Sequence, residues 1–367
     1  MSEREMARVD GTTWDVVVIG GGSAGLSAAL NLARVRRSVL VIDAGEPRNA
    51  PAEEVGVHGL LGREGISPLE LLRLGREEVA SYGGRVVAGR VSRIERRDDG
   101  FGVITQDARE VREVRARRLL VATGLVDELP DVPGLSKRWG RDVHHCVYCH
   151  GWEVRDTKIG VLGSFHQALM FRQMSDDVTL FPNGGPELTD QQWEQLAGLG
   201  VAVVDGPVTG LRIDDRDRLV GVLLGSGAVV PVHHLVVAPY FVARAGFLDG
   251  LDLPLRDHPR GVGKQLAVDA GGFTGVAGIW AAGNVSDLLA GVPAAAAAGV
   301  GAAAAINTDL LTADAERAAA LRTPPQHTPP SAAFAPFDAF APAMEAEVSR
   351  RILGTRVHGL DSPTAEL

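Results

Sequence analysis

The amino-acid sequence predicts an α/β fold of two three-layer domains, in which parallel sheets lie between helices and one domain is inserted into the other. Residues 14–19 form a β-branched apolar run, typical of a strand that is buried on both faces of a parallel sheet. A glycine-rich turn and a helical pattern follow, and a second pattern of strand, turn and helix begins at residue 158. A last buried strand at residues 278–282 precedes a long helix rich in alanine and glycine, which indicates that the chain returns to its first sheet.

We assign the first domain to residues 1–126 and 242–322, the inserted domain to residues 127–241, and a Pro-rich linker and tail to residues 323–367. In the first domain we expect strands at residues 14–19, 38–42, 118–122 and 278–282, a small antiparallel meander at 85–90, 92–95, 102–106 and 110–115, and helices at 26–34, 68–80 and 291–311, the last continuing through 312–320. In the inserted domain we expect strands at residues 158–162, 177–181, 201–204, 211–213, 219–224 and 235–238 and a helix near 166–174. Residues 239–254, where the chain leaves this domain, are expected to be irregular.

Composition and charge exclude several classes of protein. Hydrophobic residues make up 45% and charged residues 23% of the chain, which is too apolar for intrinsic disorder. The formal net charge of −9 is the opposite of what nucleic-acid binders usually carry, so we expect no nucleic-acid partner. The chain opens without a basic and apolar leader, and we expect a cytoplasmic protein. Residues 288–306 carry no charge and are long enough to span a bilayer. They are mostly alanine and glycine, however, which favours a closely packed helix over a membrane span.

A dinucleotide-binding motif follows the first strand. Gly20, Gly22 and Gly25 satisfy G-x-G-x-x-G, and Asp43 ends the next strand. Gly20 permits the turn, Gly22 allows a pyrophosphate to approach the backbone, and Gly25 allows the helix and the strand to pack closely. Asp43 is placed to accept hydrogen bonds from an adenosine ribose. This combination predicts a Rossmann-like nucleotide site in the first domain.

Three ordered motifs give the chain a specific resemblance over about residues 14–311. They are Val121-Ala122-Thr123-Gly124, then Cys146-Val147-Tyr148-Cys149-His150-Gly151, then the segment from Gly278 to Val285. In this order they resemble the low-molecular-weight thioredoxin reductases, which are FAD-dependent pyridine nucleotide-disulfide oxidoreductases. The resemblance implies FAD, with Gly283 and Asn284 near its ribityl and phosphate portion and the start of the Ala-rich helix near its ring. Asn284 stands where the family usually has Asp, which is a mild departure because an amide also forms hydrogen bonds.

The same resemblance implies the remaining cofactor contacts and the assembly. The further residues expected at FAD are Ser23, Ala24, Ala44, Arg48, Asn49, Val91, Ala122, Thr123, Gly124 and Ala294. The family commonly forms homodimers, and we expect one here. Residues 337–352 have an amphipathic helical pattern, which predicts a subunit contact or, alternatively, a cover over a groove.

Cys146 and Cys149 are the only cysteines in the chain. Cys-x-x-Cys spacing permits an exchangeable disulfide and a lowered thiol pKa. Two alternatives stay open, a structural pair and a zinc site completed by residues from the group His144, His145 and His150, although three ligands within six residues would be unusual for zinc. The resemblance implies that Cys149 lies beside flavin C4a and that Cys146 exchanges with the substrate. His150 follows the second cysteine where the family has an acid, and we expect His150 and His145 to act catalytically with the pair.

The second nucleotide site, which a thioredoxin reductase needs for NADPH, departs from the motif. Gly163 and Ala168 fit G-x-G-x-x-A, but Phe165 occupies the position of the middle glycine. Where an arginine would hold the 2′-phosphate, the chain has Phe181-Pro182-Asn183, and Arg172 on the preceding helix is a poor substitute. NAD(P)H binding is therefore doubtful, and the alternative is that it binds in an altered pose.

These observations favour a flavin-dependent dithiol oxidase. A dithiol would reduce the cysteine pair, the pair would reduce FAD, and O2 would accept the electrons and give H2O2. This direction of electron flow is the opposite of that in a reductase, and it resembles that of the gliotoxin-type and holomycin-type dithiol oxidases, which close a disulfide in a small molecule. One alternative is a disulfide reductase fed by NAD(P)H or ferredoxin, and another is a non-enzymatic, redox-sensing flavoprotein. Tyr148 and Trp152 flank the pair and are expected either to line an apolar pocket or, for Trp152, to belong to the core.

Overall fold

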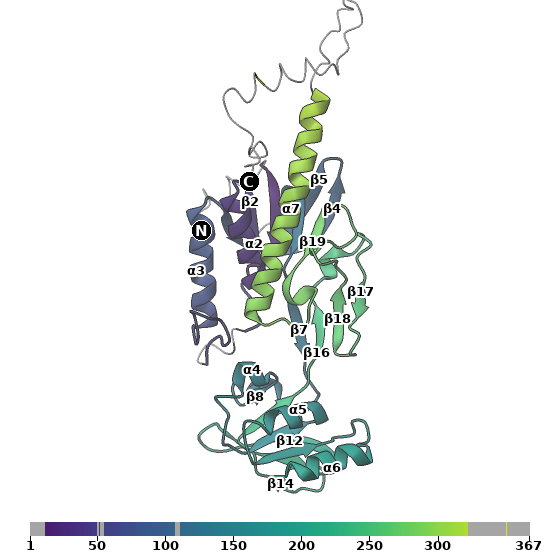
Figure 1. Cartoon of the computed structure of the whole chain (residues 1–367). Coiled ribbons are helices and arrows are strands. Elements are labelled where there is room, and N and C mark those ends of the chain that lie inside the picture. The colour runs from purple at the N-terminus through teal and green to yellow at the C-terminus, as the bar shows by residue number, and fades with distance from the viewer. Residues whose placement is uncertain (1–11, 50, 52–54, 107–110, 322–349, 351–367) are drawn as a thin grey trace, which may run out of the picture. The chain divides into compact units, whose positions relative to one another are not determined.

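The computed structural model describes residues 12–49, 51, 55–106, 111–321 and 350 (Figure 1). Met1–Thr312 forms one compact unit and Ala313–Leu367 a second, of which the structure describes residues 313–321 and 350. The amphipathic pattern at residues 337–352 lies outside the described residues, apart from position 350. The two sheets that carry the motifs belong to the first unit.

Seven strands form the first sheet in the described part of the chain, with the order β3-β2-β1-β6-β5-β4 and with β19 beside β6. The parallel strands are β1 (Thr13–Ile19), β2 (Val39–Asp43), β3 (Arg85–Ala88), β6 (Val111–Val121) and β19 (Ile279–Ala281). β4 (Arg90–Arg97) and β5 (Gly100–Gln106) add an antiparallel extension. The predicted α/β class with a parallel sheet is thereby confirmed.

Two details of this sheet correct the prediction. The meander predicted to start at residues 85–90 begins later, because β3 pairs in parallel with β2. The two strands predicted at residues 110–115 and 118–122 are one, because β6 is continuous. The reason is that β5 pairs with the first part of β6, while β1 and β19 pair with its second part. One strand thus serves both the antiparallel and the parallel part of the sheet.

Helices cover the first sheet on one face and small strands on the other. The helical side holds α2 (Ser23–Arg34), α3 (Pro68–Ser81) and α7 (Val292–Leu321), whose alanines and leucines form one core cluster with β1 and β2. The other face packs against residues of β5, β18 (Gly263–Leu266) and η3 (Gly246–Leu248). α7 is long and apolar enough to cross a membrane by length and composition alone, yet Ala302, Ile306 and Leu310 are buried in the core cluster.

A second sheet belongs to the segment between residues 143 and 237. It is parallel, with the order β11-β10-β9-β15-β8, and the same segment contains a three-stranded antiparallel sheet. The parallel strands are β8 (Val143–His144), β9 (Ile159–Leu162), β10 (Val178–Phe181), β11 (Ala202–Val203) and β15 (His234–Val237), and the antiparallel ones are β12 (Val208–Ile213), β13 (Leu219–Leu224) and β14 (Val229–Val230). The helices of this segment are α4 (Val147–His150), α5 (Phe165–Phe171) and α6 (Asp190–Gly198), with η2 at Ser136–Arg138.

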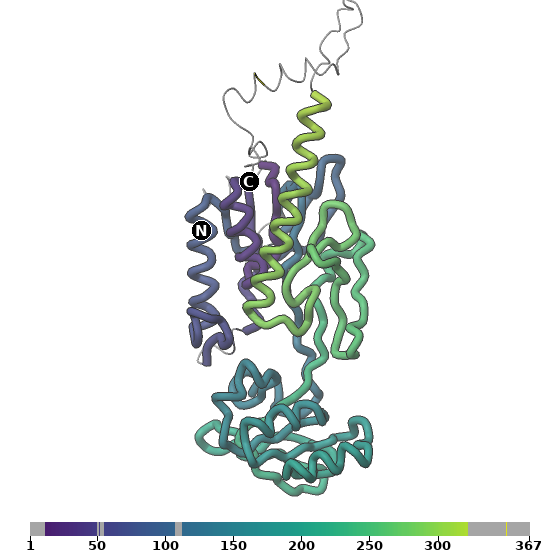
Figure 2. The backbone as a smooth tube through the Cα atoms, in the orientation of Figure 1, coloured from purple at the N-terminus to yellow at the C-terminus, as the bar shows by residue number. Residues whose placement is uncertain are grey.

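Two strands join the sheets. β7 (Leu125–Glu128) leaves the first sheet and β16 (Tyr240–Ala243) returns to it, and the two pair antiparallel (Figure 2). β18 and β17 (Leu255–Asp257) extend this pair to four strands. The prediction that residues 239–254 are irregular is therefore wrong at β16, because the partner strand that satisfies its backbone lies far away in the sequence.

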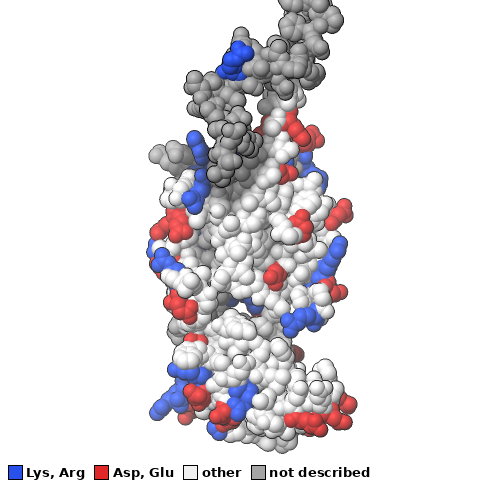
Figure 3. All heavy atoms as spheres, in the orientation of Figure 1, with Lys and Arg blue, Asp and Glu red and all other residues white. Residues whose placement is uncertain are grey.

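Acidic and basic side chains are interspersed on the face that Figure 3 shows.

Close backbone contacts explain why α7 is rich in glycine and alanine. A Cβ on Gly299 would lie 2.1 Å from the carbonyl oxygen of Ala24 in α2. A Cβ on Gly301, two residues further along α7, would have no atom within 4 Å and would face open space. Only glycine at position 299 therefore allows α7 to reach this distance from α2.

We expect Gly299→Ala to lower the free energy of unfolding by about 1–3 kcal/mol, because the added methyl group would force the two backbones apart. Gly301→Ala is the matched control and should raise it by up to about 1 kcal/mol through helix propensity. Urea denaturation of both variants measures the difference. Equal stability of the two variants would contradict the packing argument.

Candidate active site

A cavity of about 610 Å³ lies where the glycine turn, the carboxyl ends of β2 and β6 and the beginning of α7 meet, and it extends to the cysteine pair. Among the described residues, it is lined by most of the predicted site residues, which are Gly20, Gly22, Ser23, Ala24, Asp43, Ala44, Arg48, Asn49, Val91, Ala122, Thr123, Gly124, His145, Cys146, Cys149, His150, Gly283 and Asn284. Gly25 and Ala294 are not part of this lining. The first unit thus brings residues from distant parts of the chain to one cavity.

The glycine turn has the geometry that the motif predicts. Gly20 adopts φ +110°, and its Cβ would lie 2.3 Å from the carbonyl oxygen of Ala122. Gly25 packs so closely on the turn that a Cβ would lie 2.0 Å from the carbonyl oxygen of Gly20, which explains why Gly25 does not reach the cavity. A Cβ at Gly22 would meet no atom within 4 Å. The backbone at Gly22 is therefore open to a ligand at the start of α2.

Asp43 stands at the carboxyl end of β2, as expected. One carboxylate oxygen accepts a hydrogen bond of 2.7 Å from Nη2 of Arg76 on α3, and the other accepts one of 3.3 Å from the backbone N–H of Gly45. These bonds orient the carboxylate at the edge of the cavity. Sequence reasoning does not find Arg76, because nothing in the local pattern of α3 indicates a contact with residue 43.

Asn284 lies in the turn η4 (Gly283–Val285) before α7. Its side-chain amide donates to the carbonyl oxygens of Asp287 at 3.0 Å and Ala290 at 2.9 Å. An ionised aspartate could not donate these bonds, so the amide gives this turn a support that the acid would lack.

The expectation for Ala294 needs a correction. Ala294 is exposed and Ala295 lines the cavity, because the register of α7 turns residue 295 inward.

Arg48 lines the cavity but is already bound within the protein. Its guanidinium donates to both carboxylate oxygens of Asp127 at 2.7 and 2.8 Å, and it lies over the ring of Phe241 at 5.2 Å. Asp127 belongs to β7 and Phe241 to β16. Arg48 therefore ties its loop to both strands that join the two sheets.

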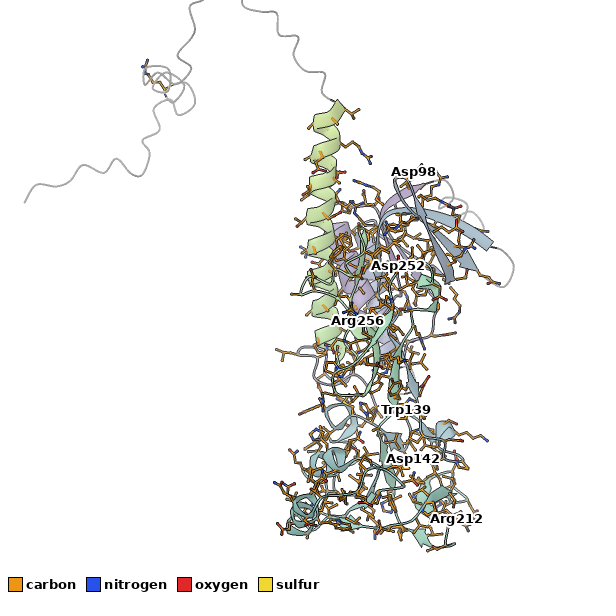
Figure 4. The ribbon with its side chains drawn as sticks, turned by 90° about the vertical axis from the view of Figure 1, so that its right-hand side faces the viewer. Asp98, Trp139, Asp142, Arg212, Asp252 and Arg256 are labelled. Carbon is orange, nitrogen blue, oxygen red and sulfur yellow. A yellow bond between two sulfur atoms is a disulfide. The ribbon has the colours of Figure 1, made fainter. Side chains whose placement is uncertain are left out.

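Cys146 and Cys149 form a disulfide, with 5.2 Å between their Cα atoms. Cys146 is the N-cap residue of the short helix α4, and both cysteines line the cavity. Cys149 is exposed and Cys146 is half-buried. Trp139, which also lines the cavity, and Asp142 lie in the segment that leads into β8, directly before the pair (Figure 4). The pair is thus accessible from the cavity that holds the glycine turn.

Three histidines, His144, His145 and His150, line the cavity with the disulfide, and a fourth, His234, contacts His144. His144 is buried and stacks on His150 with 4.8 Å between ring centroids, and its Nε2 lies 3.2 Å from Nδ1 of His234. Burial, with smaller contributions from His150 and His234, lowers the pKa of His144 to about 3. Burial and the charge of Arg48 lower the pKa of His145 to about 4. Burial also lowers the pKa values of His150 and His234. These imidazoles are neutral at pH 7.

His150 and His145 differ in how they are held. Both ring nitrogens of His150 are buried, and neither has a hydrogen-bond partner among the described residues. His145 packs edge-on against Phe241, and its Nδ1 lies 3.3 Å from Nε2 of Gln167. His145 is therefore fixed, whereas His150 has free proton-accepting capacity beside the cysteines. In the described part of the chain, no group of three or more His, Cys, Asp and Glu residues is placed to hold a metal ion.

The second strand, turn and helix unit is occupied by its own side chains. Phe165 is the first residue of α5, directly after Ser164, whose hydroxyl accepts from the backbone N–H of Gln167 at 3.3 Å. The Gln167 amide donates to the carbonyl oxygens of Val237 at 3.1 Å and His145 at 2.9 Å. These bonds cross the carboxyl ends of β15 and β8, where a nucleotide would bind in an open α/β sheet. Sequence reasoning does not find Gln167, because its partners are distant in sequence.

Arg172, the poor substitute for an arginine at the 2′-phosphate, and Asn183, at the position where that arginine is missing, both have other partners. Arg172 donates from Nε to the carbonyl oxygen of Leu199 at 2.7 Å and forms an ion pair with Asp176. The side-chain oxygen of Asn183 accepts from the backbone N–H of Val208 at 2.7 Å. Both side chains therefore have structural roles in this sheet.

A loop at residues 55–66 also borders the cavity, although the sequence predicts no site there. Its ends pair through an isolated bridge between Val57 and Ile66. His58 hydrogen-bonds with Glu64 at 2.7 Å and lies 3.5 Å from Glu153 of the segment after α4. The hydrogen bond with Glu64 raises the pKa of His58. Glycines at a spacing of three residues, at positions 56, 59, 62 and 65, are the signal that could have indicated a shaped loop.

A dinucleotide turn and a Cys-x-x-Cys disulfide in one cavity define a disulfide oxidoreductase of the thioredoxin reductase type. The chain belongs to the pyridine nucleotide-disulphide oxidoreductase family, whose model matches residues 14–301. This membership implies an enzyme, a flavin and, in most members, a pyridine nucleotide. The predicted resemblance to thioredoxin reductases is thereby confirmed.

Relatives and solved structures agree with this assignment. The chain is 30% identical over 320 residues to thioredoxin reductase tcpT of Claviceps purpurea (strain 20.1), covering 81% of this chain and 94% of that one. It is 30% identical over 323 residues to thioredoxin reductase sirT of Leptosphaeria maculans, covering 82% and 95%. The crystal structure of HlmI is similar with a TM-score of 0.75 and 43% identity, covering 84% of this chain and 96% of HlmI.

The buried histidines predict how stability depends on pH. Their folded-state pKa values lie below the ordinary 6.5, so the unfolded chain binds protons first as the pH falls. The contribution of these histidines to the free energy of unfolding should be constant above about pH 6.5 and decrease between pH 6.5 and 4, by up to about 1.4 kcal/mol per pH unit for each histidine. His144→Gln should reduce this slope in urea denaturation series. Replacing the exposed His233 with Gln is the control, and an unchanged slope in His144→Gln would refute the assignment.

Proposed function

We propose that this enzyme is an FAD-dependent dithiol oxidase that closes a disulfide in a small-molecule or peptide dithiol and passes the electrons to O2. One dithiol and one O2 give one cyclic disulfide and one H2O2. Two S–H bonds break, one S–S bond forms, and O2 receives two electrons and two protons. The observation that carries the proposal is the contrast between the two nucleotide turns, of which the first opens on the disulfide and the second is bridged by Gln167.

The residues of the first turn fit a dinucleotide with a flavin. The uncovered backbone at Gly22 and the N-terminus of α2 suit a pyrophosphate. Asp43, oriented by Arg76, suits the hydroxyls of a ribose. Gly283 and the first turn of α7 line the remainder of the cavity towards the cysteines. When bound, FAD would supply the two-electron acceptor for the cysteine pair and the donor to O2.

The cysteines provide the exchange chemistry. A substrate thiolate attacks Sγ of Cys146, the bond between Cys146 and Cys149 breaks, and Cys149 leaves as a thiolate. The second substrate thiol then attacks the mixed disulfide, closes the substrate disulfide and releases Cys146. The electron pair taken from the substrate is then held by the reduced cysteines, which line the same cavity as the glycine turn.

His150 is suited to take the proton of the attacking thiol. Its imidazole is neutral at pH 7 because burial lowers its pKa, and its ring nitrogens have no partner among the described residues. His145, fixed by Gln167 and Phe241, would position the backbone before Cys146 and not carry the proton itself. His150 stands where the family has an acid, and it thus still provides a proton acceptor beside the cysteine pair.

The direction of electron flow can be measured directly. Under anaerobic conditions we expect dithiothreitol to bleach the absorbance of the bound flavin within seconds, because it reduces the disulfide that shares the cavity. NADPH and NADH should bleach it at least about 100-fold more slowly, since Phe165 stands at the middle position of the second turn and the Gln167 side chain spans the strand ends beside it. Admission of O2 should then restore the absorbance once the dithiothreitol is consumed, with one H2O2 released for each dithiothreitol oxidised.

Two variants control this experiment. Cys149→Ser should bind the flavin but prevent its reduction by dithiothreitol, whereas Arg212→Gln, on β12, should behave like the unaltered protein. Rapid bleaching by NADPH would contradict the proposal, and so would flavin reduction by dithiothreitol that persists in Cys149→Ser.

A reductase is the second candidate, and the names of the relatives favour it, since tcpT and sirT are both called thioredoxin reductases. In that case NAD(P)H or another donor such as ferredoxin would reduce the flavin and the cysteines would reduce a disulfide. The same anaerobic titration separates the two functions, because only the reductase is reduced rapidly by such a donor. For either function we propose a cytoplasmic homodimer.

A further inference from the structure

Three strongly exposed apolar side chains lie on the two segments that border the hollows beside the disulfide, the loop at residues 55–66 and the segment at residues 147–153. Leu61, Tyr148 and Trp152 have 101%, 83% and 68% of their surface exposed. Among the described large apolar residues, only Leu321 at the end of α7 is similarly exposed, at 79%. Single exposed apolar side chains are common, but several of them beside one hollow mark an interaction site. These three residues therefore call for a functional explanation.

A second hollow lies next to the cysteine pair. It is lined by His58, Gly59, Glu64, Val147, Tyr148, Trp152, Glu153 and Met174. Val147 and Tyr148 are the two residues between the cysteines, and His58, Gly59 and Tyr148 line both this hollow and the cavity with the disulfide. A molecule bound in the second hollow would thus lie directly beside the pair.

Trp152 is held in place from one side. The guanidinium carbon of Arg155 lies 4.1 Å from the centroid of the indole ring, and Arg155 also donates to the carbonyl oxygen of Trp152 at 2.5 Å. The arginine covers one face of the ring, and the ring still has 68% of its surface exposed. Trp152 therefore offers a fixed aromatic surface, whose order is established before any ligand binds.

The glycine-rich loop forms the opposite side of the hollow. Glu64 accepts from the backbone N–H of Gly59 at 2.9 Å and hydrogen-bonds with His58, which closes the loop on itself. His58 also lies 3.5 Å from Glu153, in the segment that contains Trp152. Leu61 stands at the tip of this loop, two residues beyond Gly59. The loop thus carries Leu61 at its tip, and the contact between His58 and Glu153 links it to the segment on the other side of the hollow.

We propose that Tyr148 and Trp152 determine substrate specificity, and that they select small dithiols with a flat aromatic or heterocyclic body over hydrophilic dithiols. The inference rests on the proposed function, because it takes the dithiol to react at Cys146. An aromatic ring can stack on Trp152 and bury apolar surface, whereas a hydroxylated chain gains little from these contacts. Arg155 acts as a positioning residue, since it touches Trp152 and not the substrate.

A matched pair of probes tests this selection. 1,2-Benzenedimethanethiol and dithiothreitol both close a six-membered cyclic disulfide, but the first carries an aromatic ring where the second carries two hydroxyl groups. Steady-state oxidation by the FAD-loaded enzyme in air gives KM and kcat for each probe. The unaltered enzyme should have a KM at least about tenfold lower for the aromatic probe.

Substitutions at Trp152 should separate the probes. Trp152→Ala should raise KM for 1,2-benzenedimethanethiol about tenfold and leave kcat and the dithiothreitol KM within about twofold. Trp152→Phe, which retains a ring, should recover most of the affinity. Trp193→Ala is the control, because Trp193 is another exposed tryptophan but lies on α6. Arg155→Gln should raise the aromatic KM to a value between those of Trp152→Phe and Trp152→Ala.

The outcomes distinguish this inference from the proposed function. If dithiothreitol is not oxidised by the unaltered enzyme, the proposed function fails. If dithiothreitol is oxidised but Trp152→Ala changes the two KM values equally or not at all, only the specificity inference is overturned. If Trp152→Ala weakens oxidation of reduced thioredoxin and leaves the aromatic probe unaffected, the surface recognises a protein and the inference is likewise overturned.

Discussion

The structure of the site depends on close contact between backbones around the start of α2. Gly25 lies against the carbonyl oxygen of Gly20, and Gly299 of α7 lies against that of Ala24. These contacts bring the N-termini of both helices to the same end of the first sheet, where they line one cavity. A side chain at Gly299 would separate the two helices, and one at Gly25 would push α2 away from the glycine turn. The small residues of α7 are therefore a packing requirement of the dinucleotide site, and the membrane-like composition of the helix follows from it.

Local periodicity is sufficient to predict most of the parallel strands, though not β3 and β8, together with the first glycine turn and the long final helix. Each of these is encoded within a short window, in which β-branched runs, G-x-G-x-x-G and an alanine-rich pattern are legible on their own. β16 and the continuity of β6 are not predictable in this way, because their partner strands lie elsewhere in the sequence. The same limit applies to the site. Gln167, Arg76 and His58 act through partners at least five residues away, and only the glycines beside His58 leave a local signal.

Burial keeps the histidines near the disulfide neutral, and this has a chemical consequence. A protonated imidazole next to the pair would favour thiolates but could not accept a proton from an incoming thiol. The neutral His150 can accept one, and the neutral His144 stacked on it avoids repulsion if His150 becomes charged. His58 differs, because its bond with Glu64 raises its pKa. The cavity is thus lined by a neutral imidazole at His150 and by a more basic one at His58.

The two nucleotide turns show how one supersecondary unit can serve either binding or structure. At the first turn, the lack of a side chain at Gly22 leaves the backbone open. At the second, Phe165 replaces the middle glycine, and Gln167 uses the strand-end carbonyl of Val237 and that of His145 as its own partners. The bond to His145, the residue directly before Cys146, connects the second turn to the segment of the disulfide. Restoring a glycine at position 165 alone would therefore not restore a nucleotide site, because the crevice would still be spanned by bonds that hold the segment of the disulfide in place.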